Sequence, residues 1–389
     1  MNRILNFIAS RILSNLEKFL SGKSLFTKKK TLLIIRLDAI GDYILFRNFI
    51  KEIRNSPKFS GYKISLFGNE KWRDIAETFD RSVIDKFIWT NVYRLKGQSN
   101  WKYRVLTMLK MHVSGYEIVV RPNDTKSKLT DYIIRSCGAE KVIDNPSDSF
   151  LFKEEPEAIS SNGNVRGTGL NAESIFQFNR NKTFIEEITG NRSTLTRPTI
   201  EIEKNKNSTE NIVIFPGAGH GSRKWSAENF SVLCNKIFQL KKIKIIICGN
   251  SCDTATAKEI MAKCSPDLIQ DLTGKTSLSE LIYVIANAKL LISNETCAVH
   301  IGAAVNTKTI CISNGNHFGR FNPYPEKIAR FIKTIYPPEI SDEFQNYFAL
   351  VKKFHVISHV DINKITPQLV FEESKEFFPF KISTEDVET

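Results

Sequence analysis

Short, continuously apolar segments alternate with stretches of helical periodicity along most of this chain, and this alternation restricts the fold more than any other feature. TLLIIRL (31–37) and YEIVVRP (116–122) are such segments in the first half, and NIVIFPG (211–217) and AKLLISN (288–294) are their counterparts in the second. Strands that are apolar on both sides are buried on both faces, as in a parallel sheet that helices cover. The sequence therefore predicts an α/β fold built from doubly wound parallel sheets.

Two domains are expected from the chain length and from one polar segment. A chain of 389 residues is too long for one ordinary core but suits two domains. Residues 203–210 (EKNKNSTE) are polar and lack apolar periodicity, which is typical of a linker. We therefore predict an N-terminal domain over residues 31–202 and a C-terminal domain over residues 211–335. Residues 336–389 are predicted to form C-terminal helices and a tail, and the sequence leaves open whether these helices pack back on the N-terminal domain.

The first 30 residues are predicted to form a basic amphipathic helix. One helical face collects apolar side chains, and arginines and lysines lie between them. Such a helix suits an anionic bilayer surface, and it equally suits packing on the protein itself or on a second subunit. The sequence contains no run of about 20 apolar residues, so no membrane-spanning helix is predicted.

The net charge of +13, from 55 lysines and arginines against 42 acidic residues, favours anionic partners. Phosphorylated small molecules and anionic membrane surfaces fit this sign, and so does nucleic acid. Nucleic-acid binding is not predicted, because the basic residues are dispersed and no binding module is recognised. The seven cysteines form no CxxC pair at metal-ligand spacing, so we predict reduced cytosolic thiols and no metal site.

The string PGAGHGSRKW (216–225) combines three glycines with two basic residues directly after a predicted strand. Glycines let backbone N–H groups approach an anion, and Arg223 and Lys224 bring positive charge to the same loop. A plain strand-to-helix turn would explain two glycines, but not three glycines beside an Arg-Lys pair. We therefore predict an anion-binding loop.

The string SNETCAVHIGAA (293–304) also follows a predicted strand. Glu295 and the N-terminal amides of the next helix could hold a sugar hydroxyl and a phosphate. In the alternative, Asn294 or Thr296 caps the helix and His300 is half-buried. The string by itself fits both interpretations.

The string RLDAIGDYILF (36–46) places Gly41 and Asp42 where a buried strand hands over to a helix. A turn needs the glycine, so the aspartate requires a reason of its own. Capping of the helix by Asp42 or by Asp38 is one such reason. RPND (121–124), after another predicted strand, either contacts a substrate or forms a loop with a proline turn.

Taken in order, three strings resemble the bacterial ADP-heptose:lipopolysaccharide heptosyltransferase family, which has the two-Rossmann GT-B fold. The resemblance covers roughly residues 31–330. The departures are Glu295 for the usual Asp, Cys297 for the usual Gly, and Ser226 where Pro is common. The family's basic residue two positions before the tryptophan is Arg223 here. The matching strings are Arg36 with Ile40-Gly41-Asp42; Pro216-Gly217-Ala218 with Lys224-Trp225; and Asn294-Glu295-Thr296-Cys297-Ala298-Val299-His300-Ile301-Gly302-Ala303-Ala304.

The resemblance implies an inverting glycosyltransferase whose two Rossmann-like domains face a central cleft. By analogy, Asp42 is the base that takes the proton of the acceptor hydroxyl, and Gly41 gives the tight turn that aims it. The family is thought to stabilise the leaving diphosphate with protein groups, which implies no metal and no cofactor. The donor implied is a nucleotide sugar, ADP-heptose, and the acceptor is a lipid-linked anionic glycan on the cytoplasmic face of the inner membrane. The enzyme would then be cytoplasmic and peripherally bound to that anionic membrane surface.

The resemblance also assigns further roles to individual residues. The residues implied to bind the donor phosphates and nucleotide are Gly217, Ala218, Gly219, Ser222, Arg223, Lys224, Thr296 and Cys297. Those implied to bind the donor sugar are Asn294, Glu295 and His300. Those implied to bind the acceptor are Arg36, Asp38, Gly41, Arg121 and Asn123. The rival interpretations are a transferase for another nucleotide sugar, a sugar-nucleotide epimerase, and a non-catalytic membrane-associated nucleotide-binding protein.

Overall fold

The computed structural model divides into two compact units, residues 1–155 with 181–194 and residues 156–180 with 195–389. The division after Thr194 lies upstream of the segment predicted as a linker, and residues 156–180 cluster with the second unit. The residues that the structure describes are 11, 15–16, 18–20, 22–96, 100–122, 128–145, 157–159, 165–166, 172–205 and 210–377.

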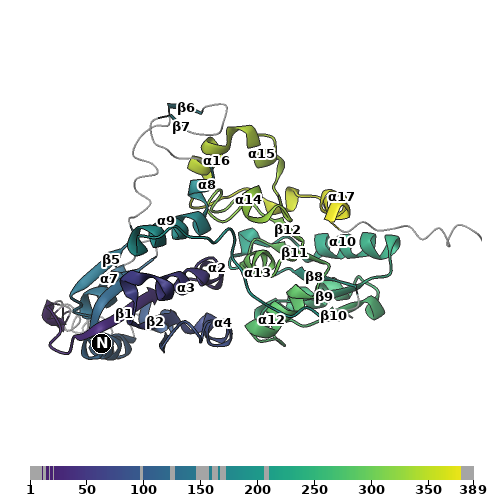
Figure 1. Ribbon diagram of the computed structural model, residues 1–389. Helices are drawn as coiled ribbons and strands as arrows, with labels where there is room; N and C mark the ends of the chain where they lie inside the picture. The colour runs from purple at the N-terminus through teal and green to yellow at the C-terminus, as the bar shows by residue number, and fades with distance from the viewer. Residues whose placement is uncertain are drawn as a thin grey trace, which may run out of the picture. The chain divides into compact units, whose positions relative to one another are not determined.

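The first unit contains a five-stranded sheet in the order β3-β2-β1-β4-β5, and every pairing in it is parallel (Figure 1). Its strands are β1 (Lys28–Arg36), β2 (Lys63–Asn69), β3 (Lys86–Thr90), β4 (Tyr116–Arg121) and β5 (Lys141–Asp144). The helices described between them are α2 (Ile40–Ile44), α3 (Asn48–Asn55), α4 (Arg73–Phe79), α5 (Val92–Lys96), α6 (Trp101–Ser114) and α7 (Lys128–Ser136). The strand order reverses between β1 and β4, and ligands of such sheets bind at the carboxyl ends beside that point.

The second unit contains a six-stranded sheet in the order β10-β9-β8-β11-β12-β13, again with parallel pairing throughout. Its strands are β8 (Asn211–Phe215), β9 (Lys244–Ile247), β10 (Ile269–Asp271), β11 (Leu290–Asn294), β12 (Thr309–Ile312) and β13 (Ile332–Ile335). Its helices are α10 (Ala227–Leu240), α11 (Thr254–Met261), α12 (Leu278–Ala286), α13 (Cys297–Val305), α14 (Glu326–Ala329), α15 (Pro338–Ser341), α16 (Tyr347–Phe354) and α17 (Pro367–Phe377). The order reverses between β8 and β11, so the loops after these two strands meet at one edge.

Two smaller pieces complete the described chain. The short strands β6 (Glu157–Ile159) and β7 (Val165–Arg166) pair antiparallel. Helices α8 (Ala172–Ile175) and α9 (Gln177–Thr189) follow, and the division between the units falls inside α9.

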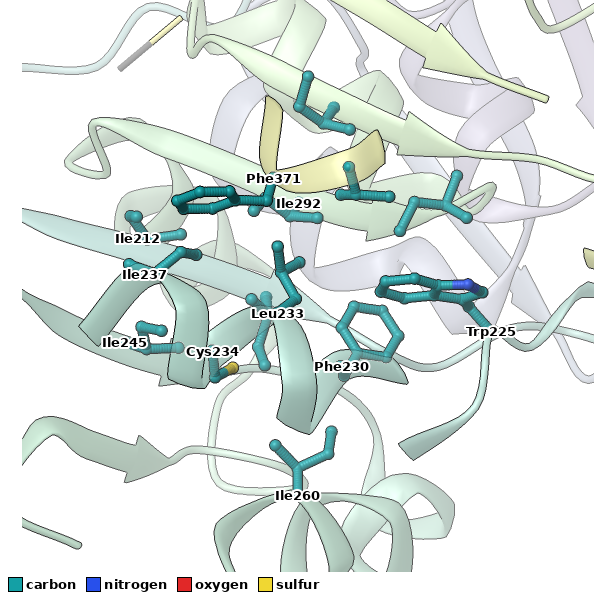
Figure 2. Close-up of a cluster of buried hydrophobic side chains, with 14 of the residues drawn as sticks. Ile212, Trp225, Phe230, Leu233, Cys234, Ile237, Ile245, Ile260, Ile292 and Phe371 are labelled. Carbon is teal, nitrogen blue, oxygen red and sulfur yellow. The ribbon is translucent and has the colours of Figure 1, made fainter. Parts of the chain in front are cut away.

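Apolar side chains from β8, β9 and β11 form the core of the second unit with residues of α10 and α17 (Figure 2). Trp225 and Phe230 pack edge to face, with ring centroids 4.9 Å apart. Phe371, on α17, joins the same cluster beside Ile212 and Ile237. The C-terminal helix therefore belongs by its packing to the second unit.

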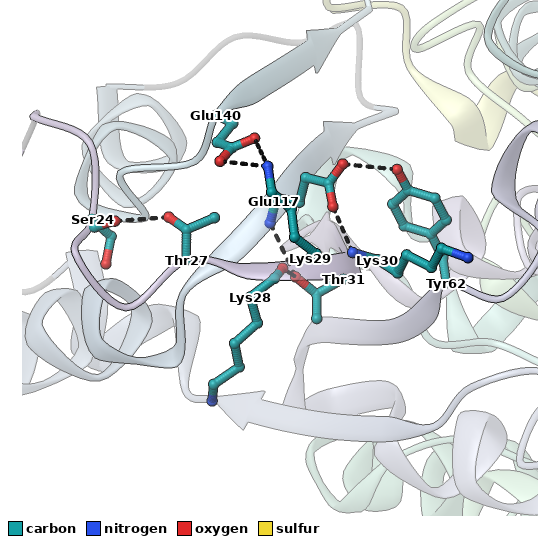
Figure 3. Close-up of polar contacts among 9 residues, drawn as sticks. All are labelled: Ser24, Thr27, Lys28, Lys29, Lys30, Thr31, Tyr62, Glu117 and Glu140. Carbon is teal, nitrogen blue, oxygen red and sulfur yellow. Dashed lines mark hydrogen bonds and ion pairs between the residues drawn. The ribbon is translucent and has the colours of Figure 1, made fainter.

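The helix predicted over the first 30 residues does not extend to residue 30 in the structure. Strand β1 already begins at Lys28, and its first residues are held by polar contacts (Figure 3). Lys29 Nζ binds the Glu140 carboxylate at 2.8 Å, and the Lys30 N–H donates to Glu117. Leu20 is buried in the core of the first unit, so this part of the apolar face packs on the protein itself. Residues 1–10 lie outside the described residues.

Candidate active site

Asp42 lies in the first turn of α2, directly after the loop that follows β1. The N-cap of this helix is Ala39, and no side chain makes a capping hydrogen bond there. Neither Asp38 nor Asp42 is therefore the helix cap. The Asp42 side chain is half-buried, and its carboxylate has no hydrogen-bond or ion-pair partner among the residues that the structure describes. Its carboxylate thus has hydrogen-bonding capacity that the described part of the fold does not use.

Arg36, at the end of β1, fixes the loop that carries Asp42. Its side chain is only 1% exposed. Nη2 donates to the backbone oxygen of Asp42 at 2.9 Å and pairs with Asp38 Oδ2 at 2.7 Å, and the guanidinium lies 4.4 Å from the ring centre of Phe46. We expected Arg36 and Asp38 to contact an acceptor. The contacts in the structure instead make them positioning residues for the loop.

Two polar groups of the loop and helix are bound by the rest of the first unit. The backbone oxygen of Asp38 accepts from Asn69 Nδ2 at 3.0 Å and from Trp72 Nε1 at 3.2 Å. The Tyr43 ring stacks on Trp72 with centroids 4.0 Å apart, and its hydroxyl donates to Asp80 at 2.6 Å. Burial raises the pKa of Tyr43 well above its usual value, so the hydroxyl stays a donor. The position of Asp42 is therefore set by Arg36 on β1, by Asn69 on β2, and by Trp72 and Asp80, which lie directly before and after α4.

Three predicted residues of the first unit have other roles or lie outside the description. Gly41 lies inside α2 and is not among the glycines with positive φ, so a tight turn does not explain it. Arg121 is buried and pairs with Asp144 and, at 2.5 Å, with Asp131. Its charge is thereby neutralised inside the unit, which argues against acceptor binding. Asn123 lies outside the described residues.

In the second unit, the Asp253 carboxylate accounts for the glycine at position 217 and for the ion pair of Lys224. A Cβ atom at position 217 would lie 2.4 Å from Asp253 Oδ2, so only glycine fits under this carboxylate. The Asp253 side chain is 2% exposed, and Lys224 Nζ binds its Oδ1 at 3.1 Å. We expected Lys224 to bind phosphate, and the structure instead pairs its charge within the unit.

Arg223 differs from its neighbour. It is half-buried, and its guanidinium has no hydrogen bond or ion pair with any residue in the described part of the chain. Its charge acts at a distance, because it lowers the pKa of Glu295 against the opposing effect of burial. Residue 219 lies against the Arg223 side chain, because a Cβ atom at position 219 would lie 2.8 Å from Arg223 Nη2. A side chain at position 219 would therefore displace the guanidinium. Arg223 is therefore the basic residue of this loop whose charge is available to an anion.

The remaining loop residues are held by strand ends. Asn294, which is fully buried, accepts from the Trp225 N–H at 3.2 Å and donates to Pro216 O at 2.7 Å. A side chain without exposed surface cannot reach a sugar, so Asn294 positions the glycine loop instead. Ser222 is exposed and Ala218 is half-buried. Asn314 Nδ2 donates to the Ser222 backbone oxygen at 3.2 Å.

The loop between β11 and α13 combines a cap with a buried acid. Thr296 caps α13 by accepting from the Ala298 N–H at 3.2 Å, as the capping alternative predicts. Glu295 is buried and accepts a hydrogen bond from Ser313 Oγ. Burial raises the pKa of Glu295, while the Ser313 bond and Arg223 oppose that rise. Burial also raises the pKa of Cys297 to about 11, so the first residue of α13 carries a neutral thiol.

His300 is a buried residue of α13 with an internal partner. Its Nδ1 lies 2.6 Å from the Tyr324 hydroxyl. Burial lowers the pKa of His300 to about 4, so the imidazole is neutral at physiological pH. Any contact of His300 with the donor sugar would therefore come from a neutral, buried ring. The contact that the structure shows is the one with Tyr324, within the second unit.

The depressed pKa of His300 predicts an acid-sensitive stability. Between pH about 6.5 and about 4 the unfolded chain binds a proton at this position and the folded chain does not, so the free energy of unfolding falls as the pH is lowered through this window. The full contribution is about 3 kcal/mol. His300→Gln should flatten this part of the stability curve measured by denaturant titration. His359→Gln, at an exposed histidine, is the control and should leave the curve unchanged.

Three residues that organise the site were not predicted. Asp253 supports Gly217 and Lys224, Ser313 binds Glu295, and Asn314 holds Ser222. Each follows the carboxyl end of β9 or β12, where polar residues in the strings GNSCD and SNGN give a weak signal. Within the described part of the chain, no group of three or more His, Cys, Asp or Glu side chains is placed to hold a metal ion. No helix among the same residues is long and apolar enough to cross a membrane.

Comparison with known proteins shows what part of this chain is similar to. Residues 184–348 match the model of glycosyltransferase family 9 (heptosyltransferase). Lipopolysaccharide heptosyltransferase 3 of Escherichia coli (strain K12) is 31% identical over 121 residues, which are 31% of this chain and 35% of that protein. The match thus spans about a third of that relative's length. Lipopolysaccharide heptosyltransferase 1 of Campylobacter coli is 26% identical over 319 residues, which are 77% of this chain and 88% of the relative.

A solved structure shows the same fold at low identity. The E. coli heptosyltransferase WaaC with ADP-2-deoxy-2-fluoro heptose aligns with a TM-score of 0.62 and 15% identity, over 89% of this chain and 99% of that chain. The predicted GT-B type of α/β fold, with two parallel sheets, is confirmed by this match.

Proposed function

We propose that this chain is a family 9 glycosyltransferase that transfers heptose from ADP-heptose to a lipopolysaccharide-core acceptor with inversion at the anomeric carbon, and the match of residues 184–348 to that family's model supports this proposal. The observation that carries this proposal is a pair of charged groups without ion-pair partners among the described residues. Asp42 follows β1 beside the reversal of the first sheet, and Arg223 follows β8 beside the reversal of the second. Such positions are where doubly wound sheets bind their ligands.

Asp42 supplies the base in this proposal. A sugar hydroxyl is barely acidic, so a carboxylate within hydrogen-bond reach must take its proton as the new bond forms. The acceptor oxygen attacks the anomeric carbon, the bond from that carbon to the phosphate oxygen breaks, and ADP leaves with the electron pair. Arg36 contributes by fixing the backbone of Asp42 through its 2.9 Å bond, which keeps the carboxylate in one place.

Arg223 and the surrounding N–H groups stabilise the departing diphosphate in this proposal. Gly219 is exposed and adds no side chain to the loop beside Arg223, and α13 presents its N-terminus at the neighbouring strand end. Negative charge that develops on the phosphate is stabilised by such preorganised donors. The relatives support ADP-heptose as the donor, since their names specify heptose transfer and the solved structure contains ADP-2-deoxy-2-fluoro heptose.

The two adjacent basic residues should respond differently to substitution. Arg223→Gln should weaken ADP binding by about 10- to 150-fold, because it removes a charge-assisted contact worth about 1.5–3 kcal/mol. Lys224→Gln should change ADP affinity by less than threefold and lower the melting temperature instead, because Asp253 then loses its buried partner. Isothermal titration calorimetry with ADP measures the first effect and a thermal melt the second. Equal losses of ADP affinity in both variants would contradict this division of roles.

A transfer assay tests the function itself. ADP-heptose and a heptose-free lipopolysaccharide acceptor are incubated with the chain, and the product is identified by mass spectrometry and by the anomeric coupling in its NMR spectrum. We expect one added heptose and inverted configuration. Transfer from UDP-, GDP- or CMP-sugars but not from ADP-heptose would refute the donor, and conversion of the donor without an acceptor would point to an epimerase.

The proposed acceptor is attached to a lipid, so we also propose that the enzyme works peripherally at the anionic cytoplasmic face of the inner membrane. The net charge of +13 supports this location.

A further inference from the structure

Large apolar side chains are exposed on one part of the first unit. In the loop before β1, Leu25 is 97% exposed and Phe26 is 52% exposed. Helix α6 exposes Leu106, Leu109 and Val113, which lie three and four residues apart and therefore share one face. Solvent-exposed apolar groups of this size gathered together indicate an interaction surface.

The loop and the helix are neighbours, so these side chains form one surface. Ser24 Oγ donates to the His112 backbone oxygen at 2.8 Å, and the Lys28 N–H donates to Gly115 O at 3.3 Å. A Cβ atom at Gly115 would lie 1.9 Å from the Phe26 backbone oxygen, so the loop lies directly against the end of α6. We call Leu25, Phe26, Leu106, Leu109 and Val113, with Lys23, Lys28, Lys102 and Lys110, the basic apolar face.

The two segments that form this face carry positive charge only, and Glu140 is the neighbouring acid that interacts with Lys23. Neither residues 22–30 nor α6 contains an acidic residue. The four lysines are exposed and their ammonium groups have no hydrogen-bond or ion-pair partner within the described chain, and Figure 3 shows the Lys28 side chain directed away from Glu117 and Glu140. A second copy of the chain docking face to face would bring these lysines against each other, which disfavours a dimer through this surface.

We propose that the basic apolar face is a membrane-contact surface that inserts its apolar side chains into an anionic bilayer. Apolar residues flanked by lysines bind at the boundary between headgroups and acyl chains, and each lysine near the surface adds attraction to anionic lipid. This proposal deepens the proposed function by naming the surface that would present the enzyme to a lipid-linked acceptor. It also places this contact on the folded unit rather than on an amphipathic N-terminal helix alone.

Vesicle binding of the full chain tests the proposal without reference to catalysis. Sucrose-loaded vesicles of phosphatidylcholine with phosphatidylglycerol, and of phosphatidylcholine alone, are sedimented with the parent chain and its variants. Leu25→Ser/Phe26→Ser/Val113→Ser should bind the anionic vesicles at least about tenfold more weakly than the parent. Lys102→Gln/Lys110→Gln should lose about tenfold and reduce the salt dependence of binding. Val356→Ser/Ile357→Ser, at exposed apolar residues of the second unit, is the matched control and should bind like the parent.

Four results would overturn the proposal. The parent fails to bind anionic vesicles, or the triple variant binds them like the parent. The triple variant changes the melting temperature by several degrees, which would mean that other residues of the chain cover these side chains. The triple variant abolishes a concentration-dependent dimer while vesicle binding stays unchanged, which would make the surface a subunit contact. Transfer to a water-soluble acceptor fragment should be the same in the parent and the triple variant. If neither chain transfers heptose while the parent still binds anionic vesicles, the proposed function is refuted and the proposed membrane surface is not.

Discussion

Asp42→Asn should lower the turnover number by about two to four orders of magnitude, the usual contribution of a positioned general base. The amide cannot accept the proton of the acceptor hydroxyl, while its size matches the carboxylate. The fold should be unaffected, because the Asp42 carboxylate makes no hydrogen bond or ion pair with the described residues that the substitution would remove. ADP affinity should also be unchanged, since the residues assigned to the phosphates belong to the second unit. Steady-state transfer assays and calorimetry with ADP measure the two quantities.

Two comparisons make the result specific to Asp42. Asp267→Asn, at an exposed acid of the second unit, removes the same charge elsewhere and should keep the turnover of the parent. Arg36→Gln should lower turnover less than Asp42→Asn and should change the pH profile, because it frees the backbone of Asp42 and leaves the carboxylate in place. Turnover within a factor of a few of the parent in a folded Asp42→Asn chain would remove Asp42 from the mechanism.

Trp225→Ala should produce the largest loss of stability among the substitutions that we consider. The side chain is 1% exposed and packs against Phe230, and its Nε1 donates to Ile365 O at 2.8 Å. Removing a buried tryptophan costs about 3–5 kcal/mol through lost burial and the cavity left behind. The same residue ends the glycine loop, so ADP affinity should fall as well. Denaturant titration and calorimetry measure the two losses.

Trp225→Phe separates packing from hydrogen bonding. It keeps most of the buried ring and removes only the bond to Ile365, so it should cost about 1 kcal/mol plus a small packing loss. ADP binding should then remain close to that of the parent. Equal destabilisation by the Ala and Phe variants would contradict the assignment of most of the effect to packing.

The parts of the fold that the sequence predicted are those with a strong local signal. Strands β1, β4, β8 and β11 are central, and their continuous apolar runs identify them. Strands β10 (IQD) and β13 (IKTI) were not predicted, because both are short edge strands with polar residues. The string RPTIEI (197–202) has the pattern of a strand, but none forms there, and the Ile200 N–H binds Ala304 O outside any sheet. The string DYILFRNFIKEIRNS (42–56) has the spacing of one helix, but the structure divides it into α2 and α3, because apolar spacing does not show a break at residues 45–47.

The site was predictable to the level of loops but not of individual partners. The glycine string located the loop after β8, yet the sequence could not tell Arg223 from Lys224. Their difference depends on Asp253, which is distant in sequence and reaches Lys224 only because β9 lies beside β8. Asn294 is a similar case, because its amide braces Pro216 and Trp225 across the sheet edge. Such roles follow from strand order, which single-sequence patterns do not contain.

A crystal structure of the chain with a non-hydrolysable ADP-heptose analogue and an acceptor fragment tests the central claim most directly. We expect the diphosphate on Arg223 and the 217–222 backbone, and a carboxylate oxygen of Asp42 within about 3 Å of the acceptor hydroxyl. A diphosphate bound away from that loop, or an acceptor hydroxyl served by a different base, would contradict the account.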